Sequence, residues 1–208
     1  MKKGKYIYSL IYMLILLAVT GCSSSVAIKA NSDKSADIKL NIDISGSVQN
    51  LLDSYDVAID AESVEQLGKS LEAYSFHNVK ASSKSKSSIS IDGTIKDSTQ
   101  QNAIAITDSS LDLTISPESM QALLESMPEE SRYYFDLFAA PVFTGEEMNK
   151  EEYTELLSVI YGNDIAGEIE KAILKITLES PAGKKTVFKL PVIDFLTLNS
   201  EKTFSIKY

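Results

Sequence analysis

Apolar and polar residues alternate along much of the chain, beginning near residue 38. Ile38, Leu40 and Ile42 are separated by single charged or amide residues. A period of two predicts a β-strand with one buried and one solvated face. The same kind of pattern predicts further strands at residues 75–82, 87–97, 103–106, 111–115, 172–179, 186–190 and 204–208.

A helical period replaces this alternation in the middle of the chain. Ser116 followed by Pro117 predicts a helix start, because serine caps helices and proline fits the first helical position. Asn149 with Glu152 three residues later predicts another helix start, and Gly162 predicts the end of that helix. Further helical pieces are predicted at residues 60–74, after Pro128 and at residues 163–169.

Strands and helices therefore fall in separate blocks along the sequence. Residues 37–115 are mainly strands, residues 116–170 are helical, and residues 172–208 are strands again. This order, with one solvated face per strand, is typical of an α+β fold with an antiparallel β-sheet. We expect the helical block, residues 116–170, to pack on one face of that sheet.

The first 22 residues have the features of an export signal. Three of the first five residues are lysine, and the apolar run that follows, residues 6–19, is too short to be interpreted first as a membrane span. Residues 19–22 are Val-Thr-Gly-Cys, which resembles the lipobox of bacterial lipoprotein precursors. The resemblance implies that the chain is cut before Cys22, and that this cysteine is acylated on its sulfur and on its new amino group.

The lipobox divides the chain into three parts. Residues 1–21 are the predicted signal peptide, residues 22–36 a flexible tether without periodicity, and residues 37–208 a single α+β domain. The resemblance implies a domain outside the cytoplasm, anchored by lipid on Cys22 to the cell membrane or the outer membrane. The closing residues 190–208, LPVIDFLTLNSEKTFSIKY, are similar to uncharacterised single-domain lipoproteins of spirochaetes and of the mycobacterial LppM type, which share no catalytic motif.

Negative charge is concentrated in the helical block. The chain has a formal net charge of −9, and residues 116–170 contain 13 acidic and two basic residues. Nucleic-acid binding requires lysine and arginine against phosphate, so the charge argues against a nucleic-acid partner. The acidic block is either a solvated face or a binding surface for a protein partner with a basic surface. Because anionic lipid headgroups would repel it, we expect it to face away from the membrane.

A possible metal site lies after the first predicted strand. Asp43, Ser45 and Ser47 have the spacing of metal-dependent adhesion domains of the von Willebrand A type, and hard cations favour such oxygen ligands. That fold requires a strand buried on both faces, whereas Lys39 and Asn41 interrupt this one. The sequence therefore favours an ordinary turn, and a metal-dependent adhesin is the less favoured interpretation. We expect no bound metal and no cofactor.

Catalytic chemistry has little support in the sequence. His77 is the single histidine, and no nucleophile stands out beside it. Glutamate pairs at residues 129–130, 146–147 and 151–152 suggest a glycosidase, but adjacent residues on a helix do not face each other. A carboxylate pair assembled from distant positions stays open. We expect the protein not to be an enzyme.

The helical block also carries methionine and aromatic residues at helical spacing. Such residues are usually core, but helices that stand off the sheet would use them to line an apolar groove. The candidate ligand-binding residues are Met120, Leu124, Met127, Tyr134, Phe138, Tyr153, Leu157 and Tyr161. The favoured interpretation is a lipid-anchored interaction or structural module of the cell envelope. The alternative is a carrier of an apolar small ligand.

Overall fold

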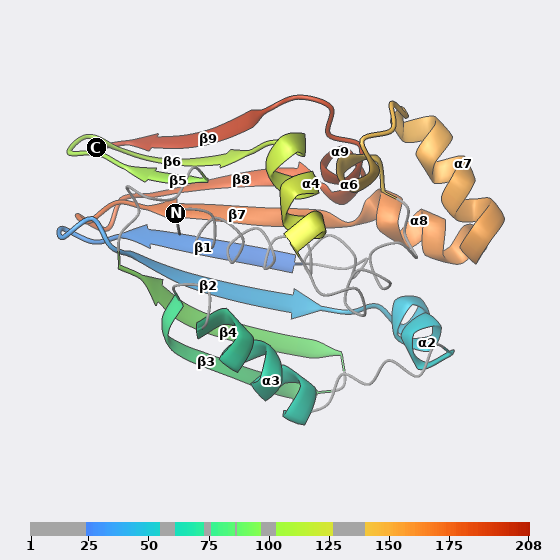
Figure 1. Ribbon diagram of the computed structural model, residues 1–208, viewed down its shortest axis with the longest axis horizontal. Helices are drawn as coiled ribbons and strands as arrows, with labels where there is room; N and C mark the ends of the chain where they lie inside the picture. Colours follow the sequence, from blue (N-terminus) through green and yellow to red (C-terminus); the bar gives the residue numbers. More distant parts are fainter. Residues whose placement is uncertain (1–23, 55–60, 73–75, 86, 97–102, 127–139) are drawn as a thin grey trace.

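A six-stranded β-sheet runs through the middle of the computed structural model (Figure 1). The structure describes residues 24–54, 61–72, 76–85, 87–96, 103–126 and 140–208. The large sheet contains β1 (Ser24–Ala30), β2 (Ala36–Asp43), β3 (Phe76–Ser85), β4 (Ser88–Ile95), β7 (Ile173–Glu179) and β8 (Lys185–Pro191), in the order β3-β4-β2-β1-β7-β8. Neighbouring strands are antiparallel except β1 and β7, which run parallel.

Strand β1 corrects the predicted tether. It lies inside the large sheet, between β2 and β7, and its alternate residues Val26 and Ile28 are fully buried. A flexible tether over residues 22–36 is therefore wrong, because residues 24–30 form a strand and β2 begins only six residues after it ends. The domain includes residues 24–36 as well as the predicted 37–208.

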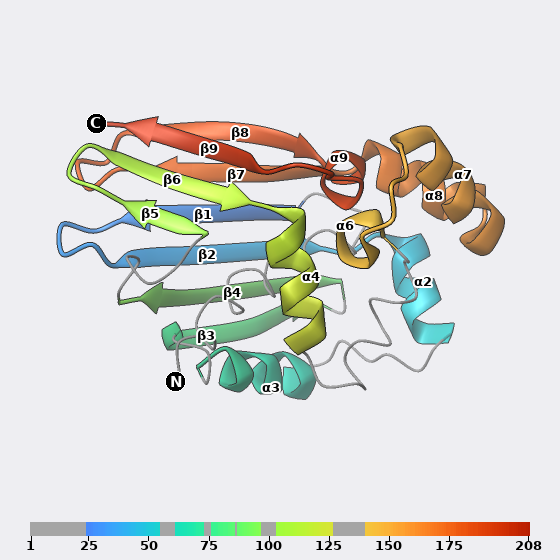
Figure 2. The ribbon, with the colours of Figure 1, turned by 45° about the horizontal axis from the view of Figure 1, so that its top comes forward.

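A second, smaller sheet covers part of one face of the large sheet. It contains β5 (Ile104–Ile106), β6 (Ser110–Ile115) and β9 (Lys202–Lys207), paired antiparallel in the order β5-β6-β9. The rings of Phe188 in β8 and Phe204 in β9 have centroids 5.3 Å apart, which places the small sheet on the face that bears Phe188. Figure 2 shows β5 and β6 of the small sheet crossing in front of the large one.

The described helices lie between and beyond the strands. They are α2 (Gly46–Ser54), α3 (Ala61–Glu72), α4 (Pro117–Ser126), α6 (Pro141–Thr144), α7 (Lys150–Tyr161), α8 (Asn163–Lys171) and α9 (Val192–Leu196). Helices α3, α4, α7 and α8 confirm predicted helices, whereas α2, α6 and α9 were not predicted. The helical piece expected after Pro128 lies outside the described residues.

The architecture is α+β, as the separate blocks of strands and helices predict. It differs from the expectation in having two sheets and one parallel strand pair. Parallel strands need a long crossover instead of a hairpin, and β1 and β7 are separated by most of the chain. Among the described helices, none has the length and apolar character that a membrane crossing requires.

The large sheet has one apolar face and one polar face. On the apolar face, Val26 of β1 lies between its cross-strand partners Leu40 and Ile176, and all three side chains are fully buried. The opposite face, here called the outer face, carries exposed lysines such as Lys29 and Lys39. The small sheet and α4 lie in front of the large sheet, on its apolar side (Figure 2), and α3 packs along β3 (Figure 1).

Candidate functional site

Helices α4, α6 and α9 lie close to one another at one end of the sheets (Figure 2). Residues of α4 and α6, together with residues that follow α6 and α9, line a polar groove there. Its volume is about 690 Å³. The lining residues are Pro117, Glu118, Gln121, Pro141, Gly145, Glu146, Glu147, Met148, Asn149, Thr197, Leu198 and Asn199. Three of them are glutamates and none is a base, so we call this site the acidic groove.

Helix α4 forms one wall of the acidic groove. Its start is capped as predicted: the Ser119 amide donates to Oγ of Ser116 at 3.2 Å, and the Ser119 hydroxyl donates to the Ser116 carbonyl oxygen at 2.8 Å. Pro117 takes the first helical position, where its missing N–H costs nothing. Glu118 and Gln121 are three residues apart on the helix, so both reach the groove from the same side.

The loop after α6 forms the opposite wall. Helix α6 ends at Gly145, whose φ is +77° and whose amide donates to the Pro141 carbonyl oxygen at 2.9 Å. A Cβ atom at this position would lie 3.2 Å from Nε2 of Gln121. Both the left-handed backbone and the close approach of α4 therefore favour glycine. The sharp helix end places Glu146 and Glu147 at the rim of the groove.

Two contacts hold α9 beside the groove. Phe143 of α6 and Phe195 of α9 pack edge to face, with ring centroids 6.5 Å apart. Nζ of Lys150, at the start of α7, lies 2.6 Å from Oδ1 of Asp194 in α9. The Asp194 side chain is only 25% exposed, so this ion pair is partly shielded from solvent. Helices α6 and α7 are thus both fixed to α9.

A second hollow of about 360 Å³ lies beside α7 and extends the acidic surface. It is lined by Lys150, Glu151, Thr154, Glu155, Ser158, Glu170 and Ile193. Together the two linings contain six glutamates and one base, Lys150, which is already paired with Asp194. A surface with an excess of one charge attracts ligands of the opposite charge. The arrangement suits a cationic ligand.

Five of the eight predicted apolar ligand-binding residues are described, and all five belong to the core or pack against it. Met120, Tyr153 and Leu157 are buried, and Leu124 and Tyr161 are partly buried against the core. None of these five lines either described hollow. Met127, Tyr134 and Phe138 lie outside the described residues. The apolar-ligand role of this set stays a prediction.

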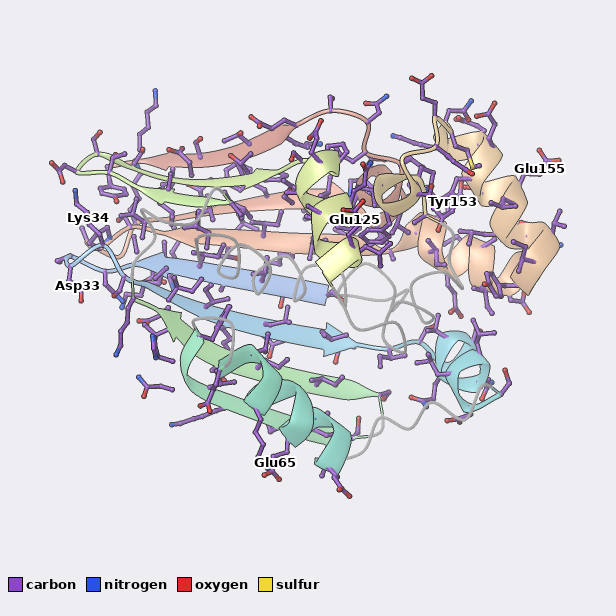
Figure 3. All side chains as sticks on the ribbon, viewed as in Figure 1. Asp33, Lys34, Glu65, Glu125, Tyr153 and Glu155 are labelled. Atoms are coloured by element: carbon purple, nitrogen blue, oxygen red, sulfur yellow. The ribbon has the colours of Figure 1, made fainter. Side chains whose placement is uncertain are left out.

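Tyr153 is the largest fully buried side chain among the described residues. Burial raises the pKa of its phenol well above the usual range, and the neighbouring Tyr161 raises it further. The hydroxyl therefore stays neutral at physiological pH. Figure 3 shows Tyr153 on the side of α7 that faces the rest of the molecule and Glu155 on the other side. Tyr153 anchors the helix while its glutamates remain exposed.

The residues of the possible metal site make a different contact. The hydroxyl groups of Ser45 and Ser47 both donate to the carboxylate of Glu168 in α8, Ser47 at 2.9 Å. Oγ of Ser45 also accepts the Val48 amide at 3.2 Å, so the predicted turn is the capped start of α2. Asp43 is exposed and takes no part in this cluster. Among the described residues, no group of three or more metal-ligating acids, histidines or cysteines occurs.

The remaining candidate residues are not brought together. His77 pairs with Thr94 across β3 and β4, on elements that do not line the acidic groove. The glutamate pair at 146–147 lies at the rim of the groove, whereas the pair at 129–130 lies outside the described residues. Cys22, the predicted lipidation site, also lies outside them, two residues before the start of β1.

Sequence reasoning pointed to the acidic block but not to the residues that shape its groove. Gln121, Gly145 and Thr197 come from three separate segments, and only folding brings them together. One signal was available, because glycine directly before Glu146 and Glu147 indicates a chain reversal that exposes both carboxylates.

No protein-family model matches the sequence, and a search of curated proteins finds no significant match.

Proposed function

We propose that the protein is a lipid-anchored, non-enzymatic module of the cell envelope that binds a protein partner with a basic surface in the acidic groove. Its anchor is acylated Cys22, in the cell membrane or the outer membrane, and its domain lies outside the cytoplasm. The anchoring part rests on the resemblance of residues 19–22 to a lipobox. The binding part rests on one observation, the excess of acidic residues in the linings of the two hollows, which together contain six glutamates and one lysine.

The groove has the chemistry to select lysine or arginine side chains. Glu118, Glu146 and Glu147 provide acceptors for charge-assisted hydrogen bonds with a cation. Gln121 and Asn199 add neutral amides, which hydrogen-bond to the backbone or polar side chains of a partner. Carboxylates and amides in the described lining favour a basic protein over an apolar small ligand.

A synthetic lysine- and arginine-rich peptide tests the binding part. Reversing two rim charges with Glu146→Lys and Glu147→Lys should weaken peptide binding by roughly tenfold, at about 0.7 kcal/mol per exposed charge. The matched control reverses two exposed glutamates on α3, with Glu62→Lys and Glu72→Lys. Calorimetric titration at low and high salt measures both. If the two double variants lose peptide affinity equally, the effect of charge is non-specific and the proposed binding site is refuted.

A separate experiment on membrane fractions tests the anchor. The wild-type chain should sediment with membranes and show an acyl mass increment on the peptide that begins at Cys22. Cys22→Ser should leave an uncut precursor without that increment. Maturation of the serine variant at the same bond would refute lipoprotein processing, whatever the groove binds.

A further inference from the structure

The three neighbouring strands β1, β7 and β8 carry positive charge in an acidic protein. They contain four lysines, Lys29, Lys175, Lys185 and Lys189, and one acid, Glu179. That acid is paired with Lys185 at 3.1 Å. These strands therefore have a net charge of +3, whereas the whole chain has −9.

Two of these lysines face each other across the sheet. Lys175 of β7 is the direct cross-strand partner of Lys189 of β8, and both are exposed. Within the described part of the chain, neither has an ion-pair partner. Like charges directly opposite in a sheet are destabilising, so this pair does not serve the stability of the isolated fold. A negatively charged surface against the outer face would relieve the repulsion.

Apolar side chains lie beside the lysine pair. Val187, two residues before Lys189, is 49% exposed, and Ile173, two residues before Lys175, is 36% exposed. Residues two apart on a strand share a face, so all four project from the outer face. Lysine stems cover apolar surface while their ammonium groups reach the headgroups, and aliphatic side chains enter the interface of a bilayer. We call these four residues the basic patch.

The proposed lipid anchor lies near the basic patch. Ser24 of β1 is the cross-strand partner of Leu174, the residue between Ile173 and Lys175. Consecutive Cα atoms are 3.8 Å apart, so the Cα of Cys22 lies within about 7.6 Å of that of Ser24. Acyl chains on Cys22, as proposed above, would be attached only two residues before β1 and would hold this part of the sheet close to the membrane.

We infer that the basic patch contacts the anionic headgroups of the membrane in which the protein is anchored. This inference rests on the proposed acylation of Cys22. Contact through the outer face directs the opposite side of the large sheet away from the bilayer. The helices α4 and α6, whose residues line the acidic groove, lie on that opposite side (Figure 2).

Helix α7 offers the rival contact surface. Val159 is 79% exposed and Ile160 is 51% exposed. The same helix carries Glu151, Glu152 and Glu155, all exposed, which anionic headgroups repel. The charges therefore favour the basic patch over α7, and Val159 becomes the matched control for Val187.

An environment-sensitive fluorophore on a single thiol distinguishes the two surfaces. In the full acylated chain Cys22 is blocked, so Val187→Cys or Val159→Cys provides the free thiol. Each labelled protein is reconstituted in phosphatidylcholine vesicles with and without phosphatidylglycerol, and quenching by neutral acrylamide is measured. We expect label at position 187 to be protected about fivefold or more when phosphatidylglycerol is present, and label at 159 to remain accessible.

Lysine variants test the role of charge in this contact. In the protein labelled at 187, Lys175→Gln with Lys189→Gln should abolish most of the protection, since each lysine near an anionic surface changes the contact population about fivefold. Lys202→Gln with Lys207→Gln makes the same charge change on β9 and should leave the protection intact. Equal effects of the two double variants would overturn the inference.

The outcomes separate this inference from the proposed function. If mass spectrometry finds no acyl group on Cys22 and the wild-type chain does not float with vesicles, the proposed function fails. If the chain is anchored and labels at 187 and 159 are equally quenched, only the membrane-contact face is refuted. The label at 187 could also be protected in lipid-free detergent micelles, to a degree that increases with protein concentration. That result would show that the edge strand β8 contacts a second copy of the chain, and it would also overturn the inference.

Discussion

Single residues link parts of the chain that are distant in sequence. Ser45 and Ser47, at the start of α2, donate to the carboxylate of Glu168 in α8, more than 120 residues later. The serines are typical of a helix start, and the sequence locates that local event. Their partner was not predictable, because any of 29 acidic residues has the same chemistry and only folding selects one.

Glu168→Gln tests this link. The carboxylate accepts two hydroxyl groups, and the amide that replaces it has only one acceptor oxygen. We expect the free energy of unfolding to fall by about 1–2 kcal/mol in urea denaturation. Glu170→Gln, at an exposed position of the same helix, should change it by less than about 0.5 kcal/mol. Identical transition midpoints for the two variants would show that the link does not stabilise the fold.

At the scale of elements, local sequence signals located α7 well. The Asn149 side chain accepts the Glu152 amide at 3.0 Å, and the Glu152 carboxylate accepts the Asn149 amide at 2.9 Å. This capping box is complete within four residues, so it could be predicted without tertiary contacts. Helices α6 and α9 are four and five residues long, too short for a helical period, and were therefore not predicted.

Asn149→Ala tests the contribution of the capping box. Losing the cap should lower the free energy of unfolding by about 1 kcal/mol and increase hydrogen exchange in the first turn of α7. The control is Asn50→Ala, which removes an exposed asparagine inside α2 without touching a cap. A loss of stability in the control as large as in the Asn149 variant would contradict the assignment.

Strand β1 shows why an element can be missed. Its residues Ser24, Val26, Ile28 and Ala30 do alternate as buried positions. Two of those four are serine and alanine, and the segment follows residues that resemble a lipobox, after which a tether is the ordinary expectation. Serine and alanine indicate a strand only weakly. Small side chains are nevertheless accepted in the middle of the sheet, because β2 and β7 complete the hydrogen bonds of β1 on both sides.

At the scale of the whole molecule, β1 connects the two halves of the large sheet. It pairs with β2 on one side and with β7 on the other. A chain shortened to begin at Asp37 should therefore lose its cooperative thermal unfolding, whereas a chain that begins at Ser24 should keep it. Differential scanning calorimetry measures both. A cooperative transition in the shorter chain, at the midpoint of the longer one, would mean that β1 is dispensable.

Charge is also organised at the scale of the whole molecule. The outer face of β7 and β8 carries the basic patch, and α4 and α6, on the other side of the large sheet, line the acidic groove. The sequence located the acidic block and predicted that it faces away from the membrane. The basic patch was not found, because Lys175 and Lys189 become neighbours only through the pairing of β7 with β8.

The sequence by itself determined the α+β class, most of the strands, and the four described helices α3, α4, α7 and α8. These features depend on the period of apolar residues and on caps within a few positions, which local backbone geometry imposes. Tertiary structure alone decided the parallel pairing of β1 with β7, the second sheet, the shape of the acidic groove and the partner of Ser45 and Ser47. Each of these joins residues far apart in the chain, and the choice among chemically equivalent partners is made only when the whole core packs.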